Sequence, residues 1–362
     1  MKNTALFELL KVAIGSKDCL SFPPTYVEWM ELLSECNQQL ITTAVFVGIQ
    51  KLPKEQQPPL DVYDRWASEF YALKDRTDKI VKMCRKACET HERNGFYSCV
   101  LMPRPSKSPC IWGLGGDPRD IDILCWSKEK KDGKRTIVEY VNFQYVSSTK
   151  HIKPKVVRQH VDWKSGNFPM NVNFKSSYLN CPWYNKRLEA WVREMVERPS
   201  KSPCIGGLGD LPVEFHVVYQ LMHLYKRFFC EDLRFGHLVE YYYTLRELSV
   251  ERLEDRDERL EVMRMIENLG MRKFAGAVMY VLQTVFAMSD EYLLCKPDVR
   301  HGSFVLKMTN LVGEYGRAYE RTRTLSHLGK IGRYLYWIKR NKPFITQYPS
   351  EMLFETYRKI VG

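Results

Sequence analysis

The spacing of apolar residues changes twice along this chain, and the change limits the folds open to it. Segments typical of strands occur only between residues 96 and 178, as short apolar or aromatic runs bounded by Gly, Pro and polar residues. On both sides of this stretch the apolar positions recur at helical spacing. We therefore predict an α+β protein, with a small α/β unit between a helical N-terminal region and a larger helical C-terminal region.

Four candidate strands lie in the middle stretch. They cover Phe96–Leu101, Asp120–Trp126, Lys155–Trp163 and Met170–Tyr178. A loop rich in Pro, Gly and Ser spans residues 102–118, and a helix is predicted over Thr136–Phe143. The order is therefore strand, loop, strand, helix and two further strands.

Helical patterns fill most of the remaining chain. After the strands, one apolar face includes Phe215, Val218, Met222 and Phe229. Similar patterns recur over residues 237–249, 257–268, 271–288 and 325–340. We divide the chain into an N-terminal helical region (1–75), an α/β core (76–197) and a C-terminal helical domain (210–362).

The chain is basic, and its charge is concentrated near the C-terminus. The net charge is +12, and residues 301–362 hold eleven Lys or Arg against four Asp or Glu. This excess favours an anionic partner such as a nucleotide, a nucleic acid or phosphate. A solvated basic surface gives the same composition, so charge alone does not choose between these interpretations.

Cysteine usage and hydropathy favour a cytoplasmic protein without a membrane partner. The eleven cysteines include no CxxC pair, so we expect reduced, buried thiols rather than a zinc site or disulfides. The chain begins with a helical pattern rather than a signal peptide. The longest apolar run, Phe274–Met288, contains Gln283 and is too short to cross a bilayer.

Two aspartates at the start of the second strand form the strongest candidate site. Side chains alternate along a strand, so Asp120 and Asp122 point to one face about 6–7 Å apart, whereas Ile121 and Ile123 point into a core. Carboxylates so placed suit Mg²⁺ or Mn²⁺, whose other ligands are waters and substrate phosphates. Two such ions can stabilise the attacking and leaving oxygens of phosphoryl transfer. A solvated strand face gives the same pattern, but the preceding Gly-rich loop favours a site.

These residues resemble the Asp-x-Asp motif of the polymerase-β-type nucleotidyltransferase superfamily. More closely, the chain is similar to an uncharacterised family of bacterial nucleotidyltransferases, from about Arg76 to the C-terminus. The matching segments are RDIDIL (119–124), RQHVDW (158–163), SSYLNCPWYNKRLEAW (176–191), VEFHVVYQLMHLYKRFF (213–229), HLVEYYYTL (237–245), KFAGAVMYVLQTVF (273–286) and YPSEMLFETYRK (348–359).

The resemblance implies a nucleotidyltransferase-like core with a mixed sheet. Asp120 and Asp122 match its first two metal-binding carboxylates, and a later strand supplies a third. A Gly-containing turn holds the triphosphate of a nucleoside triphosphate, for which Gly115, Gly116 and Arg119 are the candidates. The implied activity is Mg²⁺-dependent transfer of a nucleotidyl group to an acceptor, which is a protein side chain, a small metabolite or sugar, or RNA.

Two departures from the family pattern leave other functions open. The later strand usually carries Glu-x-His, where this chain has Asn171-Val172-Asn173, and an amide is neither a base nor an anion. Met102-Pro103 replaces a Lys-Gly turn, and Pro has no N–H to donate to phosphate. One alternative is therefore a catalytically impaired protein that binds nucleotide or a protein partner. A weaker one, resting on charge, is a basic helical RNA-binding protein.

Other features of the sequence carry less weight. Glu214 and His216 look like a replacement for the missing Glu-x-His, but they begin a helical pattern in which the helix dipole explains the glutamate. His160 lies on a candidate strand and could contact phosphate. Residues 104–115 and 198–209 repeat nearly the same loop, RPSKSPCI followed by Trp-Gly-Leu-Gly or Gly-Gly-Leu-Gly. Each loop could offer N–H groups and a Lys to phosphate, although a duplication without function explains them equally well.

Overall fold

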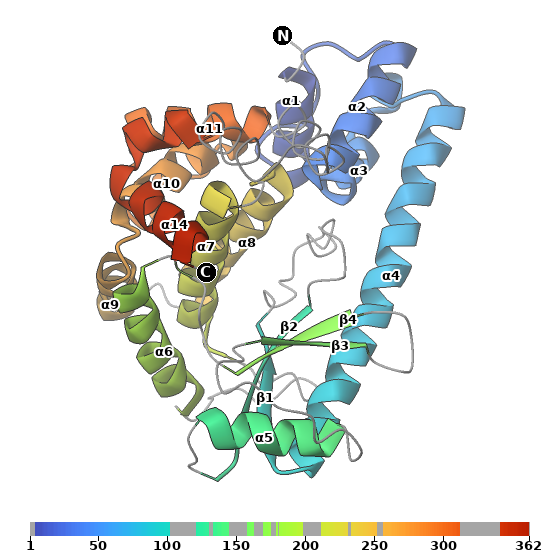
Figure 1. Ribbon diagram of the computed structural model, residues 1–362. Coiled ribbons are helices and arrows are strands. Elements are labelled where there is room, and N and C mark those ends of the chain that lie inside the picture. Colours follow the sequence, from blue (N-terminus) through green and yellow to red (C-terminus); the bar gives the residue numbers. More distant parts are fainter. Residues whose placement is uncertain are drawn as a thin grey trace, which may run out of the picture.

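Helices from both ends of the chain surround a small sheet (Figure 1). The computed structural model describes residues 4–101, 121–129, 133–144, 158–162, 169–174, 179, 181–197, 211–230, 233–251, 256–311 and 341–361. In this part of the chain the fold is mostly helical α+β with a small mixed sheet, as the spacing of apolar residues predicted. The loop at 102–118 and the helix expected at 325–340 lie outside the described residues.

The N-terminal region consists of short helices followed by one long helix. The elements are α1 (Thr4–Ile14), α2 (Tyr26–Gln39), α3 (Thr42–Lys51), the 3₁₀ turn η1 (Lys54–Gln56) and α4 (Leu60–Arg93). The long helix α4 buries Val62 and Trp66 against the N-terminal helices, and its C-terminal half packs against the first strand. The expected boundary between residues 75 and 76 therefore lies inside one continuous helix.

Four short strands form the sheet. They are β1 (Phe96–Val100), β2 (Ile121–Ser127), β3 (Arg158–Asp162) and β4 (Pro169–Asn173), in the order β1-β2-β4-β3. β1 pairs antiparallel with β2, β2 pairs parallel with β4, and β4 pairs antiparallel with β3. All four expected strands are confirmed, although β4 ends at Asn173 and does not include Phe174.

The two faces of the sheet pack against different partners. On one face, Phe96, Cys125 and Val172 form a cluster with Ile137 and Tyr140 of α5 (Gly133–Gln144). On the other face, side chains of β1, of the residue that follows it and of β2 join the main core of the helical regions. The residues that do so are Cys99, Leu101 and Leu124. In Figure 1, α5 accordingly lies on the opposite side of the sheet from α7 and α8.

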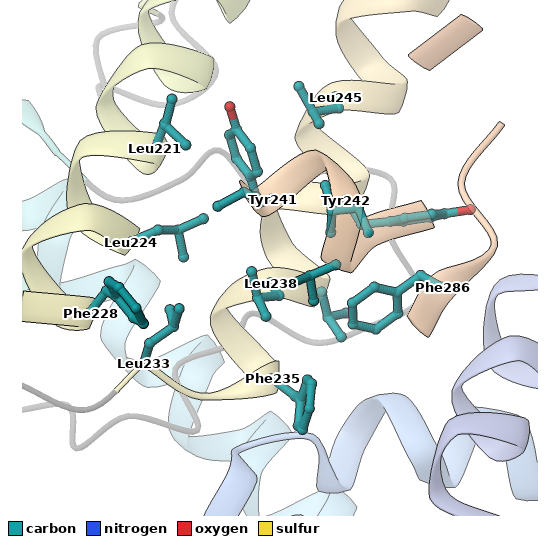
Figure 2. Packing of buried hydrophobic residues seen from close by; sticks show 14 of the residues in the cluster. Leu221, Leu224, Phe228, Leu233, Phe235, Leu238, Tyr241, Tyr242, Leu245 and Phe286 are labelled. Carbon is teal, nitrogen blue, oxygen red and sulfur yellow. The ribbon is translucent and has the colours of Figure 1, made fainter. Parts of the chain in front are cut away.

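The C-terminal region is entirely helical in its described part. Its elements are α6 (Pro182–Glu197), α7 (Val213–Cys230), α8 (Phe235–Glu251), α9 (Arg256–Asn268), α10 (Arg272–Phe286), η3 (Asp290–Tyr292), α11 (Val299–Asn310) and α14 (Pro349–Val361). Figure 2 shows Leu221 and Leu224 of α7 facing Leu238 and Tyr241 of α8, with Phe286 of α10 beside Tyr242. The same core includes residues of α1, α2 and α3, so the two helical regions pack as one.

The cysteines in the described part of the chain are free thiols. Six are buried, Cys295 is partly buried and Cys19 is exposed, which confirms the expectation that most of these cysteines are buried. Burial raises the pKa of the Cys84 thiol to about 12, so this thiol stays protonated and unreactive at neutral pH. Among the helices described, none has the length and apolar character needed to span a membrane.

Acidification should destabilise this fold through His91. The side chain is 1% exposed, its Nε2 lies 3.3 Å from the Tyr140 hydroxyl, and burial lowers its pKa to about 4. A histidine in an unfolded chain titrates near about 6.5, so the unfolded state takes up the proton first. Stability therefore falls as the pH drops from about 6.5 towards 4, and we expect His91 to contribute about 1.4 kcal/mol per pH unit in that window.

Urea unfolding of the wild type and of His91→Phe between pH 7 and pH 5 measures this contribution. Phenylalanine suits the aromatic surroundings, where Tyr140 and Phe143 contact the His91 ring edge-on, and it removes the titrating group. The slope of unfolding free energy against pH should be smaller in the variant. His237, whose pKa is also lowered by burial, remains in both proteins. Equal slopes in the two proteins would show that His91 has the same pKa in the folded and the unfolded state, so that burial does not lower it.

Candidate functional site

Asp122 is a nearly buried carboxylate near the beginning of an inner strand. It is the second residue of β2 and is only 8% exposed. Its backbone carbonyl accepts a hydrogen bond from the Leu101 N–H at 2.8 Å. Residues alternate along the strand, so Asp122 shares a face with Leu124, whereas Ile123 and Cys125 occupy the α5 face. The carboxylate therefore lies between the sheet and the helical core.

Asn173 of β4 holds this carboxylate across the sheet. Its Nδ2 donates to Oδ1 of Asp122 at 3.1 Å, and Asn173 is only 2% exposed. An ionised carboxylate only accepts hydrogen bonds, so the NH₂ end of the amide must face it. Because both residues are shielded from water, the loss of this donor would remove a hydrogen bond from a buried carboxylate.

The strand register places the sequence Asn171-Val172-Asn173 beside Asp122. In the parallel ladder, Asp122 pairs with Asn171 and Leu124 pairs with Asn173. The position at which the resemblance implies a third carboxylate is thus adjacent to Asp122 in the sheet, about 4.8 Å away between strands. In this chain that position carries an asparagine, which brings no negative charge.

His160 belongs to the same row of the sheet. It pairs with Asn171 in the antiparallel ladder between β3 and β4. Asp122, Asn171 and His160 therefore occupy neighbouring positions on three successive strands, which places His160 about 10 Å from Asp122 in backbone terms. The sequence suggested only that His160 lay on a strand near the candidate metal site.

The other predicted site residues fall elsewhere. Asp120, Gly115, Gly116 and Arg119 lie outside the described residues, as do both copies of the repeated loop. Glu214 is in the first turn of α7, which confirms that this Glu-x-His begins a helix rather than a strand. No group of three or more His, Cys, Asp or Glu with metal-binding geometry occurs within the described ranges.

Asn173 is the residue that sequence reasoning did not assign to the site. Its contact with Asp122 depends on the register between two strands separated by 51 positions in the chain. The alternation of Val172 and Phe174 with the two asparagines was the available signal, since it predicts that both asparagines avoid the apolar face. It did not specify which residue of β2 would lie beside them.

Comparisons with protein-family models, with curated proteins and with solved structures gave no match. The function of the site is therefore inferred from its geometry and from the similarity of its sequence motifs to those of nucleotidyltransferases. The geometry provides a buried carboxylate, an amide that donates to it and a second asparagine in register beside it.

Replacing Asn173 by aspartate should destabilise the protein although the side chain keeps its shape. The change removes the N–H donor and places a second carboxylate against Asp122 in a nearly dry environment. We expect a loss of more than about 2 kcal/mol in the free energy of unfolding. Asn142→Asp makes the same chemical change at an exposed position of α5 and should alter stability by less than about 0.5 kcal/mol.

Urea unfolding at neutral pH compares the two variants with the wild type. A similar, small effect of both substitutions would mean that the contact between Asn173 and Asp122 carries little energy.

Proposed function

We propose that this protein is a metal-dependent nucleotidyltransferase in which Asp120 and Asp122 hold Mg²⁺ or Mn²⁺ together with the triphosphate of a nucleotide. The observation that carries the proposal is the placement of Asp122, a carboxylate near the start of an inner strand and on the face of the mixed sheet opposite α5. Carboxylate oxygens such as those of Asp122 are the ligand type that these hard cations prefer. The basic net charge of the chain suits an anionic substrate.

The roles of the residues follow from their chemistry. A bound cation would neutralise charge that develops on the transferred phosphoryl group. Asp122 fixes a negative charge to the sheet at a place where little water screens it. Backbone N–H groups of Gly115 and Gly116, with the guanidinium of Arg119, would bind the triphosphate. Because Asn171 is no base, the acceptor's proton would pass to an aspartate or to water.

A second candidate function is nucleotide binding without transfer. The register of Asn171 beside Asp122 favours it, because the third position then contributes no charge to a cation. The two functions share the same site and differ in whether the nucleotide is consumed.

Label transfer from nucleoside triphosphates tests the proposed activity. The protein is incubated with each α-labelled nucleoside triphosphate and Mg²⁺ or Mn²⁺, first alone to detect self-modification and then with RNA or a metabolite mixture. We expect transfer by the wild type and a loss of at least about 100-fold in Asp122→Asn, because the amide keeps the side chain's shape but removes its charge. Asp78→Asn, at an exposed position of α4, is the matched control and should transfer normally.

The outcomes separate the two functions. Transfer that persists in Asp122→Asn would rule out the proposed metal site. Nucleotide binding by the wild type that depends on metal and on Asp122, without transfer to any acceptor, would favour the second function. Binding to RNA that ignores metal and weakens steeply with salt would instead support the charge-based alternative.

A further inference from the structure

Asn173 reaches Asp122 along a diagonal of the sheet. In the ladder between β2 and β4, the residue paired with Asn173 is Leu124, and Asp122 pairs with Asn171. The Asn173 amide nevertheless extends back towards the start of β2 and donates to Oδ1 of Asp122. Both residues are buried, so little water competes for this hydrogen bond.

We infer that Asn173 is a positioning residue, which fixes the Asp122 carboxylate in the orientation used to bind the cation. The inference rests on the proposed function. The terminal torsion of an aspartate has a broad minimum, so a carboxylate without donors samples a range of orientations. A hydrogen bond from a buried amide to a charged acceptor restricts this range. Outer groups of this kind commonly orient the ligands of metal sites.

The sheet does not need this pair in order to form. β2 and β4 are joined by their ladder, and Cys125, Val172 and Phe174 pack together on the α5 face. Apolar side chains of similar volume at positions 122 and 173 would avoid burying a charge, and such replacements are often neutral or stabilising. Stability alone therefore does not account for a carboxylate with an amide donor at these buried positions, which is consistent with a role in binding.

Binding of Mn²⁺ alone, followed by water-proton relaxation, tests the inference. The full-length wild type is compared with Asp122→Asn, Asn173→Ala and Asn173→Asp, with folding of each variant checked by circular dichroism. We expect the dissociation constant to rise at least about tenfold in Asp122→Asn and in Asn173→Ala, whereas Asn173→Asp, which adds a carboxylate, serves as the stability reference for the exchange variant below. Val172→Ala removes core contacts from the neighbouring residue without touching the polar pair, so it should lower stability yet keep the wild-type constant within about twofold.

The exchange variant Asp122→Asn/Asn173→Asp gives a second readout. It restores an amide and a carboxylate in contact but moves the charge from β2 to β4. We expect it to recover stability relative to Asn173→Asp without recovering Mn²⁺ binding.

Three results would overturn the inference. Asn173→Ala could keep the wild-type dissociation constant while Asp122→Asn loses binding, which would leave the proposed function standing and make Asn173 merely structural. The exchange variant could bind Mn²⁺ like the wild type, which would show that the cation does not need the carboxylate at position 122 with its donor at position 173. Binding that is indifferent to Asp122→Asn would remove the proposed metal site and the inference together.

Discussion

The side chain of Gln39 joins the two ends of the chain. Its Nε2 donates to the carbonyl of Thr309 at 3.1 Å, and its Oε1 accepts from the N–H of Phe235 at 3.2 Å. The residue is buried, so the loss of either bond would leave a backbone group unpaired, at a cost of about 1–3 kcal/mol. The edge-on contact of Phe7 with Phe235 adds apolar packing beside it. The N-terminal helices are thereby fixed against α8 and α11, and the first half of α4 is held with them.

The arrangement of these helices determines what packs against each face of the sheet. α4 starts in the shared helical core and ends beside β1, where His91 contacts Tyr140 of α5. One face of the sheet is thereby closed by α4 and α5, and the other meets the helical core through Leu101 and Leu124. The alternation of side chains along the strand then determines on which face of the sheet each residue of β2 lies. Asp122 lies on the helical side because Ile123 and Cys125 must lie on the other.

The sequence predicted the parts of this structure that depend on local spacing. The strand β2, the helix α5 and the helical nature of the segment at Glu214 were all recognisable from short-range periodicity. The shared core was not, because contacts such as that of Gln39 with Thr309 join residues 270 positions apart. For the same reason the sequence placed an aspartate at the start of β2 but did not reveal Asn173 as its donor. A register between distant strands is set by tertiary packing, which no local pattern encodes.

The neutral residue in register with Asp122, Asn171, has opposite consequences for stability and for cation binding. Carboxylates that converge on a metal site repel one another when no cation is present, and the repulsion is stronger where water is scarce. An amide at Asn171, in register with Asp122, avoids this repulsion, and the donor from Asn173 compensates the charge that remains. The metal-free sheet is stabilised by both. A cation, however, gains less from Asp122 beside a neutral residue at position 171 than from Asp122 beside a further carboxylate. Tighter binding therefore depends on a further ligand such as a nucleotide triphosphate, which brings its own negative charge to the site.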